Sequence, residues 1–301
     1  MLDRGLQPIL LDVGHLALGC CGVVIDSVLA GSFNNISLQI DSSKYDVKTG
    51  FPSRVRAVQL MTMQAKAEIE LEELGGLVRE LITEIVNSLG TLTVPVKDVD
   101  LEIFRPRGPN ILASLRGYLH QSFSLNFTDE FSNIPFTFEA FGAAEDLVTF
   151  NELSQTTFSA RPWTKEVGNI SIGKPKITIN GVSIGAIQGA ELTLTTEYKR
   201  VETGYPATLK HLIPTAHYVD CVVASEEFNN TSLSELLSVG ETVQLTYEVP
   251  LVGSDIPFRL RIPECKQLPG NLSLKQQDFS AIEKRFFAVS ENDSSPILTL
   301  F

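Results

Sequence analysis

The chain has 301 residues, a hydrophobic fraction of 43% and a formal net charge of −12. This length and apolar content suit two ordinary domains, since single hydrophobic cores stop growing near ~250–300 residues. The acidic balance argues against a protein that grips nucleic acid through its phosphates, because that affinity needs a basic face. It suits a surface past which nucleic acid moves without sticking.

The cysteines are few and carry no metal-binding spacing. They are Cys20, Cys21, Cys221 and Cys265. No CxxC motif occurs, and a disulfide framework is not expected at this chain length. Reduced, mostly buried thiols are therefore predicted.

The N-terminal apolar stretch, residues 16–25, resembles the core of a short signal peptide. Asp12 and His15 precede it, where a signal peptide would carry a basic cluster. Part of the stretch also has an internal counterpart in residues 177–183, which a cleaved leader would not have. We expect no secretion signal, and no membrane span either, because no run of about 18 apolar residues occurs.

An internal repeat organises the sequence. Shifting the chain by 154 positions places residues 23–40 on residues 177–194, with the apolar alternation in phase. Phase matters because a slip of one residue turns a strand inside out. We predict an arm over residues 1–19, one domain copy over 20–155, a link over 156–174 and a second copy over 175–301.

Later landmarks recur in the same order, with an offset that drifts as loop insertions would cause. EIFRPRG from Glu102 matches RLRIPEC from Arg259, and DEFSNIPFTFEAF from Asp129 matches QDFSAIEKRFFAV from Gln277. Each copy is rich in period-two apolar segments, and Asn180-Gly181 is a strong hairpin-turn signal.

Residues 71–89 carry leucines and isoleucines at helical spacing, which predicts a helix, with a shorter counterpart near 232–238. The predicted fold is mainly β: a sandwich or barrel in each copy with one helix at its side.

No catalytic, cofactor-binding or metal-binding constellation is recognisable. The four histidines fit no zinc motif, and no GxSxG, P-loop or GxGxxG sequence occurs. The acidic pairs Glu72-Glu73 and Glu226-Glu227 are expected at helix starts, where carboxylates complement the helix dipole. Arg105 and Arg107 form a small basic spot for which we expect a solvated or subunit-contacting role. We predict that the chain is not an enzyme and needs no cofactor.

The strand followed by TGFP at residues 49–52, repeated as TGYP at 203–206, together with the whole-domain repeat, resembles the bacteriophage tail tube (major tail) proteins. The resemblance implies two tandem β-sandwich/barrel domains, each with a flanking helix. It implies stacked rings, trimers with pseudo-sixfold symmetry, that form a virion tail tube assembled in the host cytoplasm. DNA would pass through an acidic lumen without specific binding. Expected partners are other copies of the chain and the tape measure, terminator, and distal tail or baseplate proteins.

Under this hypothesis the loops over residues 41–64 and 195–218 project from the sandwich and touch the next ring. Aromatic residues at their bends are candidate anchors, since such residues dominate interface energetics. The inter-ring contact candidates are Thr49, Gly50, Phe51, Pro52, Thr203, Gly204, Tyr205 and Pro206.

Three alternatives remain open from the sequence. One is another virion component of the same fold, such as a distal tail, hub, decoration or secretion-tube-like ring protein. Another is a sugar-binding or adhesive β-sandwich, which the lone Trp163 supports little. The last is an enzyme, although the sequence contains no recognisable set of catalytic residues.

Overall fold

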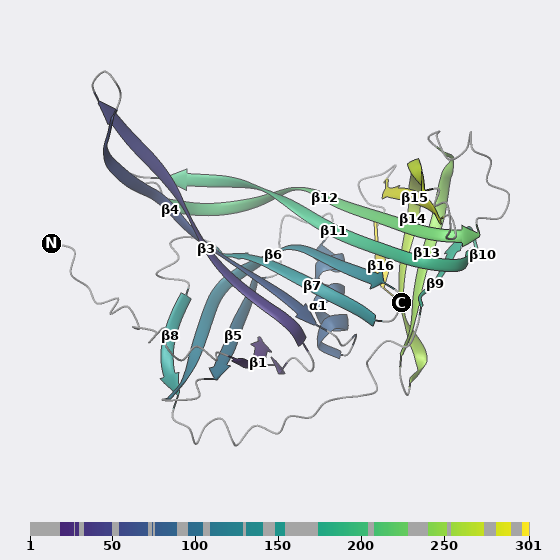
Figure 1. Ribbon diagram of the computed structural model, residues 1–301, viewed down its shortest axis with the longest axis horizontal. Coiled ribbons are helices and arrows are strands. Elements are labelled where there is room, and N and C mark those ends of the chain that lie inside the picture. Colours follow the sequence, from purple (N-terminus) through teal and green to yellow (C-terminus); the bar gives the residue numbers. More distant parts are fainter. Residues whose placement is uncertain are drawn as a thin grey trace.

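A computed structural model describes the chain over residues 19–26, 28–29, 33–49, 54–71, 74, 76–88, 96–104, 109–128, 131–140, 148–153, 174–203, 208–227, 240–251, 254–273, 281–289 and 297–300. Within these ranges the chain is mainly β, with sixteen strands and one helix, as the sequence predicts (Figure 1). The strands pair antiparallel in open sheets, and those described do not close into a barrel.

The first half of the chain contains eight strands and the helix. They are β1 (Gly19–Ile25), β2 (Val28–Leu29), β3 (Phe33–Thr49), β4 (Arg54–Leu71), α1 (Gly76–Ser88), β5 (Val96–Phe104), β6 (Asn110–Thr128), β7 (Phe131–Ala140) and β8 (Val148–Leu153). The second half contributes β9 (Lys176–Ile179), β10 (Val182–Ser183), β11 (Gly185–Thr203), β12 (Thr208–Glu227), β13 (Thr242–Leu251), β14 (Ser254–Ser273), β15 (Ala281–Ala288) and β16 (Thr299–Leu300).

Strands β9 to β16 repeat the pairing scheme of β1 to β8. In the first half β1 pairs with β2 and β5, β4 pairs with β3 and β7, and β6 pairs with β5, β7 and β8. In the second half β9 pairs with β10 and β13, β12 pairs with β11 and β15, and β14 pairs with β13, β15 and β16. The two halves therefore share one strand topology.

Irregularities in the ladders recur as well. The β3–β4 register shifts between Val47 and Lys48, and the β11–β12 register shifts between Val201 and Glu202, 154 residues later. The shifts at Phe33/Asn35 and Ile187/Gly189 correspond in the same way. Bulges are specific features of a strand pair, so their recurrence shows that the matched segments fold alike. The division into two tandem domains stays a prediction.

The Asn180-Gly181 turn is confirmed between β9 and β10. Both residues have positive φ, 49° and 81°, as a two-residue type I′ turn requires. The Asn180 side chain accepts a hydrogen bond from the Gln244 backbone N at 2.8 Å. Asp26, which precedes Asn180 by 154 positions, has φ 47° and accepts from the Asp98 backbone N at 2.9 Å. Both turns are thus tied to the neighbouring strand by the same bond.

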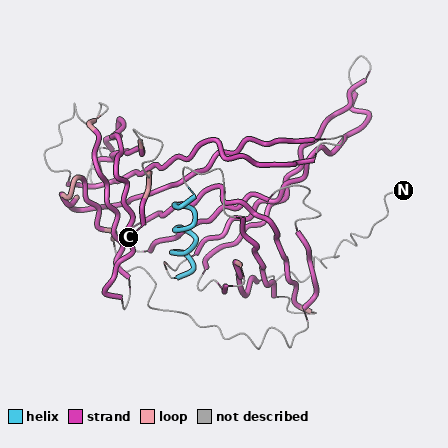
Figure 2. Tube along the Cα trace, turned by 180° about the vertical axis from the view of Figure 1, so that it is seen from behind, coloured by secondary structure: helices cyan, strands magenta, loops and turns pink. Residues whose placement is uncertain are grey.

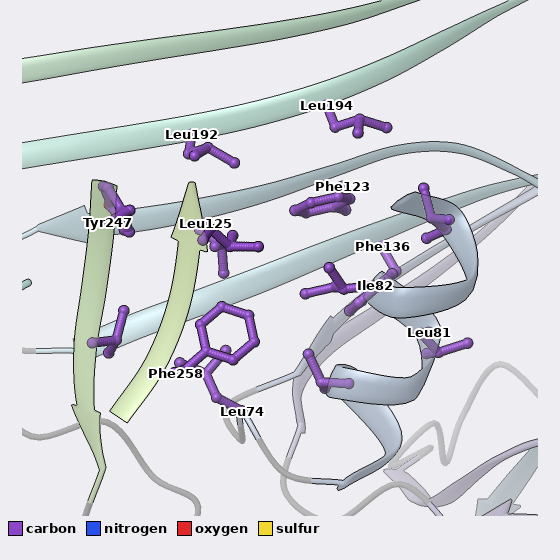
Figure 3. Close-up of a cluster of buried hydrophobic side chains, with 14 of the residues drawn as sticks. Leu74, Leu81, Ile82, Phe123, Leu125, Phe136, Leu192, Leu194, Tyr247 and Phe258 are labelled. Atoms are coloured by element: carbon purple, nitrogen blue, oxygen red, sulfur yellow. The ribbon is translucent and has the colours of Figure 1, made fainter. Parts of the chain in front are cut away.

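One hydrophobic core spans both halves (Figure 3). Phe127 of β6 and Tyr247 of β13 lie with their ring centroids 5.2 Å apart. The Tyr247 hydroxyl, fully buried, donates to the Ala190 backbone O at 3.3 Å. Burial raises the pKa of Tyr247 well above its usual value, so the hydroxyl keeps its proton and remains a donor. The two halves are consequently packed as one body at this point.

Helix α1 packs an apolar stripe, Leu81, Ile82 and Ile85, into this core. Beside this stripe, one turn before Ile82, the helix reaches the second half: Arg79 donates to the Pro257 backbone O at 3.4 Å and lies 5.5 Å from the Phe258 ring centroid.

The helix is shorter than the sequence predicts. Strand β4 continues to Leu71, because residues 67, 69 and 71 alternate into the core with period two, and the helix begins only at Gly76. The helix expected near 232–238 lies outside the described residues. The expectation that Glu226 and Glu227 start a helix is wrong, since they are the last two residues of strand β12. Glu72 and Glu73 lie outside the described residues.

A buried lysine ties α1 to the sheet. Lys97 of β5 is 8% exposed, and its Nζ contacts Asp26 at 2.7 Å and also the Glu84 carboxylate of α1. Desolvation lowers the pKa of Lys97, but hydrogen bonds and attraction from Asp26 and Glu84 outweigh it, and the net shift is upward. The ion pair therefore stabilises the fold below the unfolded pKa and is lost only as the pH rises through the folded value.

Replacing Lys97 with methionine is expected to lower the free energy of unfolding by about 1–2 kcal/mol, because two half-exposed carboxylates lose their partner. Urea unfolding at pH 7 measures this. Arg116→Met is the control, because the Arg116 side chain in its ion pairs with Asp98 and Asp100 is 45% exposed against 10% for Lys97, and more exposed pairs contribute less. Equal losses in the two variants would contradict the assignment.

Candidate assembly surface

Among the described strands, one pair joins the sheets of the two halves. β11 of the second half pairs antiparallel with β6 of the first, from Gly189 opposite Thr128 to Thr195 opposite Ser122. Around this junction the strands follow the order β14–β15–β12–β11–β6–β7–β4–β3, four from each half. We call these eight strands the joined sheet; its long strands cross the molecule in Figures 1 and 2.

One face of the joined sheet is apolar and the other is polar. Leu194, Phe123 and Phe136 lie at paired positions on the apolar face and are fully buried. The residues between them point to the opposite side, which we call the open face. It carries Thr193 on β11 and Ser124 on β6 at paired positions. The alternation follows from the period of two in a strand.

The open face is acidic where its side chains are described. Its carboxylates include Glu68, Glu70, Glu191, Glu197, Asp220, Glu226 and Glu283. Its basic residues include Lys66, Lys266 and Arg285. A surface with an excess of negative charge repels phosphate groups.

Asp220 is the carboxylate of the open face with the most perturbed titration. Desolvation by burial raises the pKa of Asp220; attraction to Arg285 lowers it, and the nearby Glu191 raises it further. A carboxylate whose pKa is higher in the folded than in the unfolded state destabilises the fold at pH values above both pKa values. At low pH, where the group is protonated in both states, the penalty disappears.

We therefore expect Asp220→Asn to raise the melting temperature at pH 7 by about 1–3 °C. The gain should shrink as the pH falls towards 4, because protonation of the wild-type carboxyl progressively removes the cost of its buried charge. Thermal unfolding from pH 4 to pH 8 checks this, with Asp255→Asn, at an exposed position of β14, as the control. A gain that is independent of pH would sink the explanation.

The segments predicted as projecting loops are strands. Residues 41–49 belong to β3, 54–64 to β4, 195–203 to β11 and 208–218 to β12. The expectation of irregular loops is wrong, because each segment completes a two-stranded ladder with its neighbour. Projection itself is observed: the ends of both hairpins extend on the same side of the molecule, far from the C-terminus (Figures 1 and 2).

Two of the contact candidates, Thr49 and Thr203, lie at the described ends of these hairpins. Thr49 closes the β3–β4 ladder opposite Arg54, and Thr203 closes the β11–β12 ladder opposite Thr208. Gly50, Phe51, Pro52, Gly204, Tyr205 and Pro206 lie outside the described residues. The described ends of the two ladders lie on the same side of the molecule, and no contact between Thr49 and Thr203 is described.

The cysteine and histidine side chains described on β12 and β14 are not arranged for catalysis. Cys221 and Cys265 are buried and unbridged, and burial raises the pKa of both thiols, that of Cys265 to about 12. Neutral thiols are poor nucleophiles. His211 and His217, expected in a loop, lie on strand β12. Desolvation lowers the pKa of His217, whose Nδ1 lies 3.1 Å from the Thr196 hydroxyl.

In the part of the chain that the structure describes, no group of three or more His, Cys, Asp or Glu side chains could hold a metal ion. The one described helix, at 13 residues, is too short to cross a membrane. Arg105 and Arg107 lie outside the described residues.

The sequence repeat did not reveal the β6–β11 junction. The repeat matches β11 to β3 and β6 to β14, so it relates the partners to other strands and not to each other. The repeat indicates only that the two like halves must contact each other; it does not indicate which strands form that contact. No family model matches this sequence, and no curated protein is similar enough to count as a relative.

Proposed function

We propose that the chain is a structural subunit that polymerises as rings, stacked into a tube, like the tail tube of a bacteriophage. The observation that supports this most is the β6–β11 junction, where two halves of like topology share one continuous sheet. A contact between unlike surfaces, repeated from chain to chain, forms a ring where the rotation closes on itself. The chain would supply one such contact internally and form the next with a neighbour.

We take the size of the ring from the resemblance to tail tube proteins: three chains supply six halves, which gives pseudo-sixfold symmetry. A closed sheet leaves no strand edge exposed, which removes the aggregation hazard of an open sheet. Holding two halves in one chain makes every second junction intramolecular and raises its effective concentration.

The lumen would be lined by the open face of the joined sheet. In this arrangement the apolar face, with Leu192 and Phe123, points outward into the core that it shares with helix α1 and strands β1, β5, β9 and β13. Its acidic residues, Glu191 and Asp220 among them, would face the DNA and keep it from sticking. This gives the acidic lumen, expected from net charge alone, a specific set of side chains.

Stacking of the rings would use the hairpin ends. Both hairpins project on one side, so a ring of such chains would carry a crown of hairpins towards the next ring. Phe51 and Tyr205 stay the candidate aromatic anchors at these ends.

The test shortens both hairpin ends. Because Thr49 pairs with Arg54, and Thr203 with Thr208, residues 50–53 and 204–207 can each be replaced by Asn-Gly, which closes a two-residue hairpin. Negative-stain electron microscopy should show tubes for the wild type across protein concentrations and single rings for the double replacement. Replacing one end alone is the intermediate control. Wild-type protein that stays monomeric at every concentration would overturn the proposal.

Tubes of normal length from the doubly shortened chain would leave the tube in place and disprove the role of the hairpin ends. The second candidate is another tail component of the same fold, such as a distal tail, hub or secretion-tube-like ring protein. It predicts rings that never extend, in the wild type as in the shortened chain.

A further inference from the structure

The joined sheet ends in two different edges. At one end β3 pairs with β4 and with no other described strand. At the other end β14 pairs with β15 from Cys265 to Ser273. On its second side β14 pairs with β13 only as far as Lys266, extended by the Gly240 backbone N donating to the Gln267 O at 2.9 Å. Residues 268–273 thus have one described neighbour.

The two edges correspond, through the repeat, to the two partners of the junction. β11 corresponds to β3 with an offset of 154, so Glu191 corresponds to Ser37. The β4–β7 and β12–β15 registers, Ile69 opposite Phe136 and Val223 opposite Lys284, set the offset between β7 and β15 at 148.

The same comparison places β14 against β6. Asn126 lies opposite Asn133, and Ser273 lies opposite Ala281, which follows Asn133 by 148 positions. Asn126 therefore corresponds to Ser273. The strand on the other side of β6 and of β14 also ends at corresponding positions. β5 pairs with β6 as far as Leu119, and β13 pairs with β14 as far as Lys266. The stretch of β6 that receives β11 thus corresponds to the stretch of β14 that has one neighbour.

We propose that β3 of one chain pairs antiparallel with β14 of a second copy, in the register of the internal junction. Glu191 lies opposite Asn126 inside the chain, so Ser37 lies opposite Ser273 of the partner subunit. Leu38 then faces the partner's Leu272, as Leu192 faces Leu125, and Gln39 faces the partner's Asn271. This inference rests on the proposed function and names the surface by which the ring closes.

The edges suit each other chemically. Ile36 and Leu38 are half-buried against the core, so a partner strand would complete their burial. The cross-strand pairs contain no like charges, which would oppose the pairing. Pro269 is exposed on β14, and proline is confined to edge strands and bulges because it lacks an N–H. Its missing donor marks where the shared ladder stops.

Cysteine pairs test the register. Ser37→Cys with Ser273→Cys places two thiols at opposed positions, whose Cα atoms would lie about 4.5–5.5 Å apart, within disulfide range. Ser37→Cys with Asn271→Cys is shifted by two residues on the same face, about 7 Å along the strand, and should not bridge. Glu191→Cys with Asn126→Cys is the corresponding intramolecular pair and confirms that this position permits a bridge.

After mild oxidation, non-reducing electrophoresis should show covalent oligomers up to the closed ring for the opposed pair. Their yield should exceed that of the shifted pair, and of each single variant, by at least about tenfold, since the bridge needs Cα atoms within about 7 Å. Dilution should not remove the bridges from assembled rings.

The outcomes separate this inference from the proposed function. Rings seen by electron microscopy without bridges in the opposed pair, or with equal bridging in the shifted pair, overturn the β3–β14 register and leave the ring intact. Monomers at all concentrations, without bridges, overturn both. A bridge in the intramolecular control together with none in the opposed pair excludes poor disulfide geometry as the explanation.

Discussion

Replacing Tyr247 with alanine is expected to lower the free energy of unfolding by about 3–5 kcal/mol. The side chain is fully buried, stacks at a tilt on Phe127 of the other half and donates to the Ala190 carbonyl. Truncation leaves a cavity where the halves meet, and it also removes the partner of a buried carbonyl. Chemical denaturation followed by fluorescence and circular dichroism measures the loss.

Tyr247→Phe is the matched control, because it keeps the ring and removes only the hydroxyl. It should cost about 1 kcal/mol. Because the core crosses from one half to the other, wild-type unfolding should be a single transition, coincident in both probes. Two separate transitions in the wild type, with the alanine variant affecting one of them alone, would show that the halves are energetically independent.

Gly270→Ala is expected to destabilise the chain by about 3 kcal/mol and to abolish assembly. A Cβ at position 270 would lie 2.0 Å from the Glu283 carbonyl O and 3.1 Å from its carbonyl C. These are backbone atoms of the neighbouring strand β15, so relief requires the β14–β15 ladder to move apart. The register of β14 and β15 shifts between Leu268 and Asn271, and the glycine lies within that irregularity.

Gly189→Ala is the control for Gly270→Ala. Gly189 lies in the β6–β11 junction, but there an added Cβ would meet only the Phe127 O at 3.6 Å, an ordinary contact. Its free energy of unfolding should change by less than about 1 kcal/mol. Denaturation curves and electron micrographs of both variants check the pair. Tubes formed by Gly270→Ala at wild-type stability would contradict the close approach of the strands.

The hairpin arms show why sequence patterns misplace some strands. In residues 197–200 the arm is polar on both faces, as Glu197, Lys199 and Arg200 show, so no alternation marks it as a strand. Its extended form comes from pairing with the facing strand of the hairpin, from Glu197 opposite Ala216 to Thr203 opposite Thr208. Pattern reasoning detects burial and does not detect hydrogen bonding between two solvated strands.

The helix boundary has a similar cause. The apolar residues before Gly76 suit a helix start as well as the end of β4, and burial of Ala67 and Ile69 against β7 decides for the strand. Tertiary packing overrides local propensity here.

By itself the sequence determined the mainly β character, the turn at Asn180-Gly181 and the correspondence of residues 23–40 with 177–194. These depend on local signals: side-chain alternation, positive φ and in-phase similarity. Only the tertiary structure decided that β11 lies beside β6, and so which face is open and which strands stand at the two ends of the joined sheet. Such pairing joins segments about 70 residues apart, and its free energy comes from the shared core around Phe127 and Tyr247, which no local pattern encodes.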